Sequence, residues 1–230
     1  MATEFWAKEF DGGGQPSAAA IVAGMKGKEP VNFDTAARDL VREGHDVVVY
    51  EYDDLFAHGD PNELPALIEA ISIDFELRTA DHARKRYAGY SLGAGIAYNL
   101  QKRTAAETDT GLIVSGGTQA AENLFENPVF KMLGLPQRFR KNGYDRPDVE
   151  ALWSDMQRPP ITPFVVAFGG LDVVVSYRQS VKMRKLWTSM GVPLSAITRP
   201  FTGHEGMKRW FNDNVPTMLE RAKALETNTH

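Results

Sequence analysis

The stretch KRYAGYSLGAGIAYNLQKR, residues 85–103, predicts a strand, a sharp turn and a helix in direct succession. KRYAGY (85–90) is suited to a buried strand, and SLGAGIAYNLQKR (91–103) is typical of a helix. Between them, GYSLG (89–93) matches the pattern G-x-S-x-G, in which small residues let neighbouring backbone approach a serine on a strained turn. Ser91 is therefore a candidate nucleophile at the end of a strand.

Strands and helices alternate along the rest of the chain. The apolar runs that predict further strands are AAAIVAG (18–24), DVVVYEY (46–52), GLIVSGG (111–117), PFVVAFGG (163–170) and LSAITRPF (194–201). The connections are long enough to hold helices, which implies parallel pairing, and the lack of alternation fits strands buried on both faces. TEFWAKEF (3–10) does alternate and predicts an antiparallel edge strand. We therefore predict an α/β fold with a doubly wound, mostly parallel sheet.

Residues 118–160 interrupt the alternation of strands and helices, because their sequence contains no pattern that clearly predicts a strand. A segment of this length without a place in the sheet is better explained as a helical insertion than as a plain loop. We predict a core made of residues 1–117 and 161–230, and a helical cap, lid or pocket wall from 118–160. Its apolar side chains are candidates for a substrate pocket, among them Phe125, Phe130 and Trp153.

Composition excludes several classes of function. The 230 residues include no cysteine, which rules out disulfides, cysteine zinc sites and thiol catalysis. The net charge of -4 leaves no basic excess to neutralise phosphates, so nucleic acid is not an expected partner. No apolar run approaches the ~18 residues of a membrane span, and the N-terminus lacks the apolar core of a signal peptide. We expect a cytoplasmic protein with no membrane partner.

Three chemically complementary side chains follow three of the predicted strands. Ser91 follows KRYAGY, Asp172 follows PFVVAFGG, and His204 follows LSAITRPF. Ligands of open α/β sheets bind beyond the carboxyl ends of the strands, where these residues would meet. A serine hydroxyl needs an adjacent base, a histidine takes and returns its proton, and a carboxylate orients the imidazole. This edge of the sheet therefore predicts nucleophilic catalysis.

These motifs resemble those of the α/β-hydrolase superfamily. The chain order Ser, Asp, His is the order of that family, GGLDVVV (169–175) is similar to its G-x-x-D-x-x-V stretch, and TGHEG (202–206) is similar to its Gly-His turn. The resemblance spans roughly residues 18–220, with 118–160 in the place of the variable cap. It implies that Ser91 is the nucleophile, Asp172 the orienting acid and His204 the base.

The resemblance also implies an oxyanion hole made of two backbone N–H groups. Leu92, after the nucleophile, would supply one, and Met25, after an early strand, would supply the other. Many members of the family carry His-Gly where this chain has Ala23-Gly24, so Lys26 is the alternative to Met25.

Further pocket candidates are Lys26, which would attract an anionic substrate, and Tyr90 and Ser115, which lie at strand ends. No carboxylate directly follows the strand before Ser115, which favours Asp172 as the acid.

The other polar residues carry weaker signals. His45, His58 and His82 stand in predicted loops or helix ends, and we expect solvated surface side chains there. The acidic residues of EYDD (51–54) follow a strand without a histidine companion, so we predict no metal site, and the expected chemistry needs no cofactor.

The resemblance implies a serine hydrolase that cleaves a carboxylic ester or thioester of a small-to-medium apolar acyl or aryl group through an acyl-enzyme on Ser91. Two other interpretations keep the same residues. The acyl group would pass to an alcohol or amine, or a peptide would be cleaved, because the motif does not separate these reactions. A non-catalytic ligand-binding member of the fold is the third interpretation, since a fold alone does not determine function.

Overall fold

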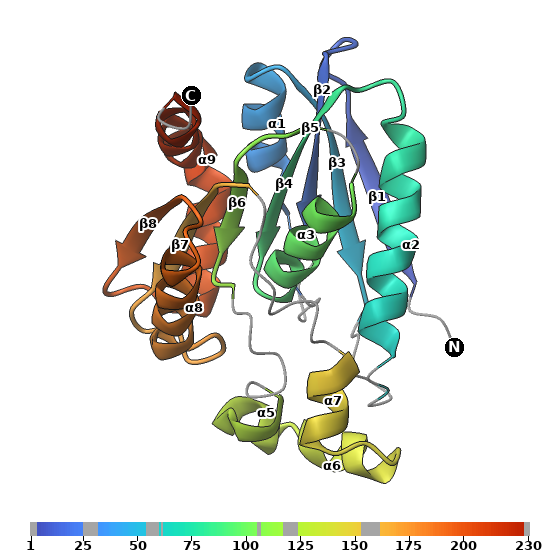
Figure 1. Cartoon of the computed structure of the whole chain (residues 1–230), viewed down its shortest axis with the longest axis vertical. Coiled ribbons are helices and arrows are strands. Elements are labelled where there is room, and N and C mark those ends of the chain that lie inside the picture. The colour runs from blue at the N-terminus through green and yellow to red at the C-terminus, as the bar shows by residue number, and fades with distance from the viewer. Residues whose placement is uncertain are drawn as a thin grey trace.

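The computed structural model describes residues 4–24, 32–53, 60, 62–104, 107–116, 124–152 and 162–227. The predicted doubly wound sheet is confirmed: one twisted sheet lies between two layers of helices, and a group of short helices lies beyond one end of the strands (Figure 1).

Within the described residues the sheet has eight strands, and seven of them form one continuous path. Their order across the sheet is β1 (Phe5–Phe10), β3 (His45–Tyr52), β2 (Ser17–Val22), β4 (Arg84–Tyr90), β6 (Gly111–Val114), β7 (Phe164–Gly169) and β8 (Leu194–Arg199). Strand β1 is antiparallel to β3, as its alternating pattern predicts, and every other pair is parallel. A two-residue strand that the sequence does not predict, β5 (Glu107–Thr108), pairs with the start of β4.

Two layers of helices cover the sheet. Helices α1 (Asp34–Arg42) and α9 (His204–Thr227) pack on one face, and α2 (Glu63–Arg78), α3 (Leu92–Arg103) and α8 (Tyr177–Ser189) pack on the other. Strand β2 shows why its run has no alternation: Ala19 and Ile21 face α1 and α9, while Ala20 and Val22 face the α2 side. Both faces of the strand are therefore apolar.

Helix α9 is bent close to Pro216. Asn214 leaves the helical region with φ -132° and ψ 21°, and the helix continues on both sides of it. Proline has no N–H and its ring displaces the preceding turn, which explains the bend. Among the described residues, no helix has both the length and the apolar character that crossing a membrane requires.

The described part of the 118–160 segment is helical. It contains α5 (Pro128–Met132), α6 (Leu135–Lys141) and α7 (Arg146–Leu152), which lie below the carboxyl ends of the strands in Figure 1. Leu135 and Phe139 anchor α6 to the core cluster beneath α2 and α3. The helices therefore stand over the end of the sheet where Ser91 lies, and their use as a lid stays a prediction.

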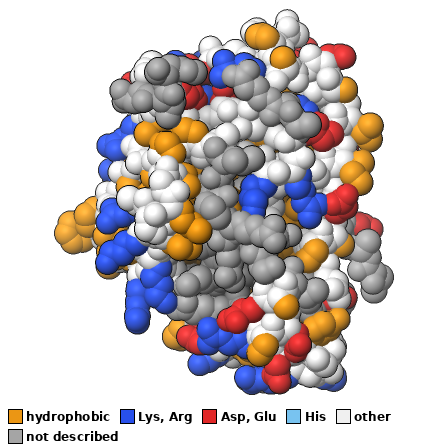
Figure 2. All heavy atoms as spheres, in the orientation of Figure 1, with side chains coloured by type: hydrophobic (Ala, Val, Ile, Leu, Met, Phe, Trp, Pro, Cys, Tyr) orange, Lys and Arg blue, Asp and Glu red, His pale blue; other side chains and the backbone are white. Residues whose placement is uncertain are grey.

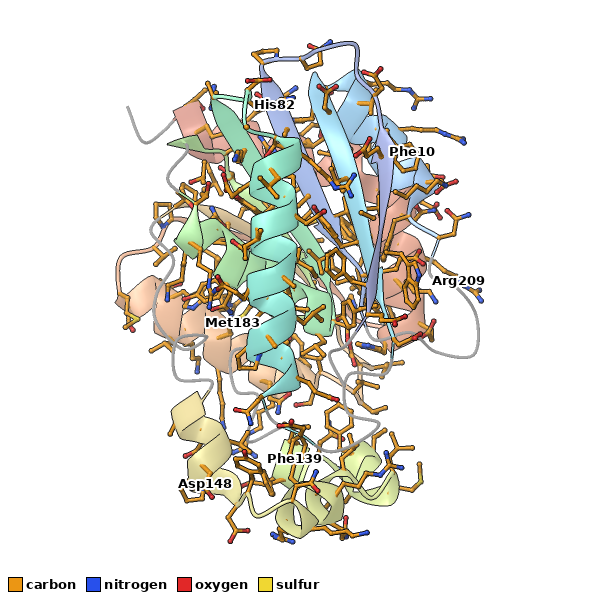
Figure 3. All side chains as sticks on the ribbon, turned by 90° about the vertical axis from the view of Figure 1, so that its right-hand side faces the viewer. Phe10, His82, Phe139, Asp148, Met183 and Arg209 are labelled. Atoms are coloured by element: carbon orange, nitrogen blue, oxygen red, sulfur yellow. The ribbon has the colours of Figure 1, made fainter. Side chains whose placement is uncertain are left out.

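Two histidines differ from the sequence expectation of solvated side chains. His45 is buried because parallel pairing sets it beside Ser17 at the start of β3. His82 lies 2.9 Å from the Asp46 carboxylate and, with Phe10 and Arg78, lines a cavity of about 220 Å³. Figure 3 shows His82 at the end of the molecule opposite Phe139, so this cavity is remote from the carboxyl ends of the strands. His58 lies outside the described residues.

Burial of His45 predicts a pH-dependent stability. Burial, followed by the positive charges of Arg86 and Arg84, lowers the pKa of His45 from 6.5 to about 4. Between these values the unfolded chain binds more protons than the folded chain, so the free energy of unfolding falls as the pH falls from about 6.5 to 4. The loss from this residue is about 3 kcal/mol. Urea titrations of the wild type and His45→Gln at several pH values measure it; equal pH slopes for the two proteins would contradict the prediction.

Candidate active site

The turn after β4 holds Ser91 in a conformation that L-residues seldom adopt. Its φ is 57° and its ψ is -125°, and α3 begins at the next residue, Leu92. The Ser91 N–H donates to the Val114 carbonyl at 2.9 Å, which extends the pairing of β4 with β6 as far as the turn. Such strain persists only where the surrounding structure enforces it, and it concentrates at functional sites.

The glycines of the motif are required by close backbone contact. A Cβ on Gly89 would lie 2.3 Å from the Gly93 carbonyl oxygen, and a Cβ on Gly93 would lie 2.1 Å from the Ala23 carbonyl oxygen. Helix α3 therefore starts directly against the end of β2. A Cβ on Gly24 would lie 3.0 Å from Ser91 Cβ, so the chain leaving β2 passes beside the serine.

The replacement Gly93→Ala tests this packing. The added methyl group meets carbonyl oxygens at the end of β2 that cannot rotate away, so we expect a loss of about 2–3 kcal/mol in unfolding free energy. Gly13→Ala is the matched control, because Gly13 has a positive φ of 85° but open space around it, and about 1–2 kcal/mol is expected there. Chemical denaturation measures both; an equal loss in the two variants would show that contact with β2 is unimportant.

Two further glycines bring the β7 and β8 ends together. A Cβ on Gly169 would lie 2.1 Å from the Thr202 carbonyl oxygen, and one on Gly170 would lie 2.3 Å from that of Pro200. The Leu171 N–H donates to the Thr202 carbonyl at 3.1 Å. The loop that carries Asp172 and the loop before His204 are thus joined along their backbones.

The three predicted side chains form one chain of hydrogen bonds. His204 Nδ1 lies 2.8 Å from Asp172 Oδ2, and His204 Nε2 lies 3.0 Å from Ser91 Oγ. The side chain of Asp172 is 1 % exposed and that of His204 is 13 % exposed. The imidazole is thus placed between a shielded carboxylate and the serine hydroxyl, which is the arrangement that activates a nucleophile.

The orientation of Asp172 is set by the backbone of its own loop. Its Oδ1 accepts hydrogen bonds from the N–H groups of Val174 at 3.0 Å and Val175 at 2.9 Å. Asn127, at the start of α5, donates from its side-chain amide to the carbonyls of Val173 and Val174. Asn127 is not predicted as a site residue from the sequence, where its signal is the Asn-Pro dipeptide that begins a helix.

Tyr90 is buried and supports the histidine, and contact with a substrate stays a prediction for this residue. Its ring centroid lies 4.9 Å from that of His204, and its hydroxyl donates to the His204 backbone carbonyl at 2.9 Å. Burial, together with the negative charges of Glu205 and Asp172, raises the pKa of Tyr90, so the hydroxyl keeps its proton. The side chain therefore braces the start of α9.

Ser115 lies at the end of β6, next to Ser91 across the sheet. Among the described residues, only these two non-glycine residues have a positive φ, which is 47° at Ser115. The hydroxyl of Ser115 is buried and has no hydrogen-bond partner within the described part of the chain. Contact with a substrate stays a prediction for this residue.

Two of the remaining pocket candidates, Phe125 and Phe130, pack in or against the core cluster that Leu92 also contacts. Phe125 is 6 % exposed and packs against Phe139, with ring centroids 6.2 Å apart, inside the core cluster; Phe130 is half-buried against the same cluster. Met25, Lys26 and Trp153 lie outside the described residues.

Solved structures of other proteins share the fold of this chain. No protein-family model and no curated protein matches the sequence. Among solved structures, acylaminoacyl peptidase from Pyrococcus horikoshii superposes with a TM-score of 0.69 at 11% identity, over 95% of this chain and 38% of the peptidase. This chain therefore spans well under half of that protein.

Two solved structures match over most of their own length. Mouse alpha/beta hydrolase domain-containing protein 10 gives a TM-score of 0.64 at 15% identity, over 97% of this chain and 96% of that one. Esterase B from Lactobacillus rhamnosis gives 0.63 at 14% identity, over 94% and 78%. The chain thus has the α/β-hydrolase fold that the sequence predicts.

Proposed function

We propose that this protein is a serine hydrolase that cleaves a carboxylic ester or thioester through an acyl-enzyme on Ser91. The observation that carries the proposal is the hydrogen-bond chain from Asp172 through His204 to Ser91, built on a turn that is strained at the serine. A nucleophilic role explains why the strained conformation is kept. The positive φ at the end of the strand directs the serine hydroxyl out of the sheet, where a substrate can reach it.

The geometry supports a two-step acyl transfer. As Ser91 Oγ attacks the substrate carbonyl carbon, its proton passes to His204 Nε2; the same nitrogen then protonates the leaving alcohol or thiol. Asp172 holds the Nδ1 proton and stabilises the imidazolium. Water then gives a proton to His204 and its oxygen attacks the acyl carbon, which releases the acid and returns the proton to Ser91. In these steps every proton moves between Ser91, His204, water and the leaving group.

The start of α3 is a suitable place for the developing oxyanion. Leu92 is the first residue of the helix, where backbone N–H groups have no acceptor within the helix. The close approach of Gly24 to Ser91 supports a second donor from the residue that follows it, Met25, with Lys26 as the alternative. Removing one donor of this kind commonly costs a few kcal/mol of barrier lowering.

The substrate class in this proposal rests on the helices above the site. The apolar residues of the 118–160 segment, with Phe130 and Trp153 as candidates, would supply the surroundings of the acyl group. A small-to-medium apolar acyl or aryl group fits such surroundings. Transfer to an alcohol or amine, and peptide cleavage, use the same residues and are decided by experiment.

The test is covalent labelling followed by a substrate panel. A fluorophosphonate is expected to phosphonylate Ser91 and no other serine, as mapped by mass spectrometry, and His204→Ala should abolish labelling. p-Nitrophenyl esters of graded chain length, acyl-CoA thioesters and an acyl-peptide amide then rank the substrates. Absence of labelling at Ser91 in folded protein would overturn the proposal, and binding of esters without turnover would favour the ligand-binding interpretation.

A further inference from the structure

Residues 171–203, which form the loop after β7, helix α8, strand β8 and the loop before α9, differ in charge from the rest of the chain. They hold five basic residues, Arg178, Lys182, Arg184, Lys185 and Arg199. Their single carboxylate is Asp172, which is buried against His204 and contributes nothing to the outer surface. The whole chain has 26 basic and 30 acidic residues, so this stretch is a positive face on a negative protein.

This stretch is called here the 171–203 face. It carries most of the large apolar side chains that are exposed among the described residues. Eleven such side chains are exposed among the described residues, and six belong to it: Leu171, Val173, Tyr177, Leu186, Met190 and Phe201. Phe201 is 90% exposed. Figure 2 shows hydrophobic and basic side chains gathered together along the edge of the molecule where α8 and β8 lie in Figure 1. Single exposed apolar residues are ordinary, whereas a gathering of them marks a contact surface.

Three of these apolar side chains belong to the loops that carry Asp172 and lead into His204. Leu171 and Val173 flank Asp172 in the sequence, and Phe201 lies three residues before His204. The hydrogen bond from the Leu171 N–H to the Thr202 carbonyl joins the two loops. A partner that covers these side chains therefore contacts the loops beside Asp172 and His204.

The basic part of the face extends outward from the same loops. Arg199 ends β8 directly before the loop of Phe201, and Arg178 stands in the first turn of α8. Within the described part of the chain, neither guanidinium has an ion-pair partner. The first acidic residue of α9, Glu205, is paired with Lys208 at 3.0 Å. The two guanidinium groups are thus available to an anionic partner.

The combination of aliphatic and basic side chains selects among anionic partners. Leu171, Val173 and Phe201 gain free energy by entering the hydrocarbon boundary of a bilayer, while Arg178 and Arg199 contact anionic headgroups. A nucleic acid would stack on the rings of Tyr177 and Phe201 but would gain little from the other four exposed apolar side chains of the face. A peripheral contact of this kind needs no membrane-spanning run, so the absence of such a run from the sequence does not bear on it.

We infer that the 171–203 face docks on an anionic lipid surface and presents the Ser91 site to it. The docking follows from charge and exposure alone. Its consequence for substrate class rests on the proposed function: the hydrolysed ester would be carried by an amphiphile that resides in the lipid surface.

The experiment is co-sedimentation of the full chain with vesicles. Vesicles of phosphatidylcholine with about one third phosphatidylserine should pellet the protein, neutral phosphatidylcholine vesicles should not, and added salt should weaken the binding. Arg178→Gln combined with Arg199→Gln should lower the partition coefficient about fivefold for each charge removed. Phe201→Ser should lower it about tenfold.

Matched substitutions elsewhere separate docking from general charge and apolar effects. Leu77→Ser removes a side chain that is 76% exposed on α2, and Arg38→Gln with Arg209→Gln removes two exposed charges on α1 and α9. These controls should bind vesicles like the wild type. Equal binding to both vesicle types, no binding to either, or equal losses in the controls would overturn the inference.

Two further measurements show which proposal a negative result contradicts. Retention on heparin without vesicle binding would identify an acidic macromolecule as the partner and would overturn the lipid assignment. Fluorophosphonate labelling of Ser91, measured without vesicles, should be unchanged in the 171–203 variants. If the wild type is not labelled, the proposed hydrolase function is contradicted and the docking result is unaffected. If the wild type does not bind vesicles, the docking inference is contradicted and the proposed hydrolase function is unaffected.

Discussion

Ser91→Ala is expected to lower kcat by about 10⁵- to 10⁶-fold on the best ester of the panel. The hydroxyl oxygen that lies 3.0 Å from His204 Nε2 is the only heavy atom removed, and the alanine methyl group that remains cannot form the acyl-enzyme. His204→Ala should cost about as much, and the double variant hardly more, because residues that act in one step are not additive. Steady-state kinetics on proteins of matched circular dichroism measures the three values.

Ser91→Gly is the control for the strained turn. Glycine adopts φ 57° and ψ -125° without the clash of a Cβ atom, so this variant should be inactive yet more stable than the wild type by about 1 kcal/mol. Ser91→Ala keeps the Cβ and should show no such gain. Residual activity within about tenfold of wild type in Ser91→Ala would remove the serine from the reaction and with it the proposed mechanism.

The sequence was sufficient to predict that Ser91, Asp172 and His204 lie together, because their meeting depends on the simplest property of a parallel sheet. Each of Ser91, Asp172 and His204 follows a strand that its local pattern predicts, and parallel strands bring their carboxyl ends to one edge. The glycines at the turns then allow the backbone segments around these three residues to approach one another closely. These glycines can be read from the sequence as well.

The supporting contacts could not be predicted because they depend on packing between distant segments. The N–H groups of Val174 and Val175 hold Asp172 only in the observed loop conformation, and the Asn127 amide reaches that loop from α5. An apolar pattern in an insertion does not separate a pocket wall from core, which is why Phe125 was a pocket candidate although it packs on Phe139. His45 is a polar residue at a strand end, where the sequence pattern indicates an exposed side chain. It is buried because the strand register places it beside Ser17.

Asp172→Asn is expected to lower kcat/KM by about 10⁴-fold with little change in fold. Oδ1 accepts from the N–H groups of Val174 and Val175, so the amide oxygen of an asparagine must take that position. Its NH₂ group then faces His204 Nδ1, which lies 2.8 Å from Oδ2 in the wild type. A donor there requires an unprotonated Nδ1, which leaves the proton on Nε2, facing Ser91. The imidazole then has no lone pair to receive the serine proton.

Three measurements separate this tautomer effect from loss of structure. The unfolding free energy of Asp172→Asn should stay within about 1–2 kcal/mol of the wild type, because the hydrogen bonds of the loop are kept. Asp172→Ala should lose more stability, since it leaves the Val174 and Val175 N–H groups without their acceptor. Asp81→Asn, at an exposed turn, should change neither activity nor stability. Wild-type activity in Asp172→Asn, with a stability loss confined to Asp172→Ala, would show that Asp172 serves the loop alone and that the carboxylate does not orient His204.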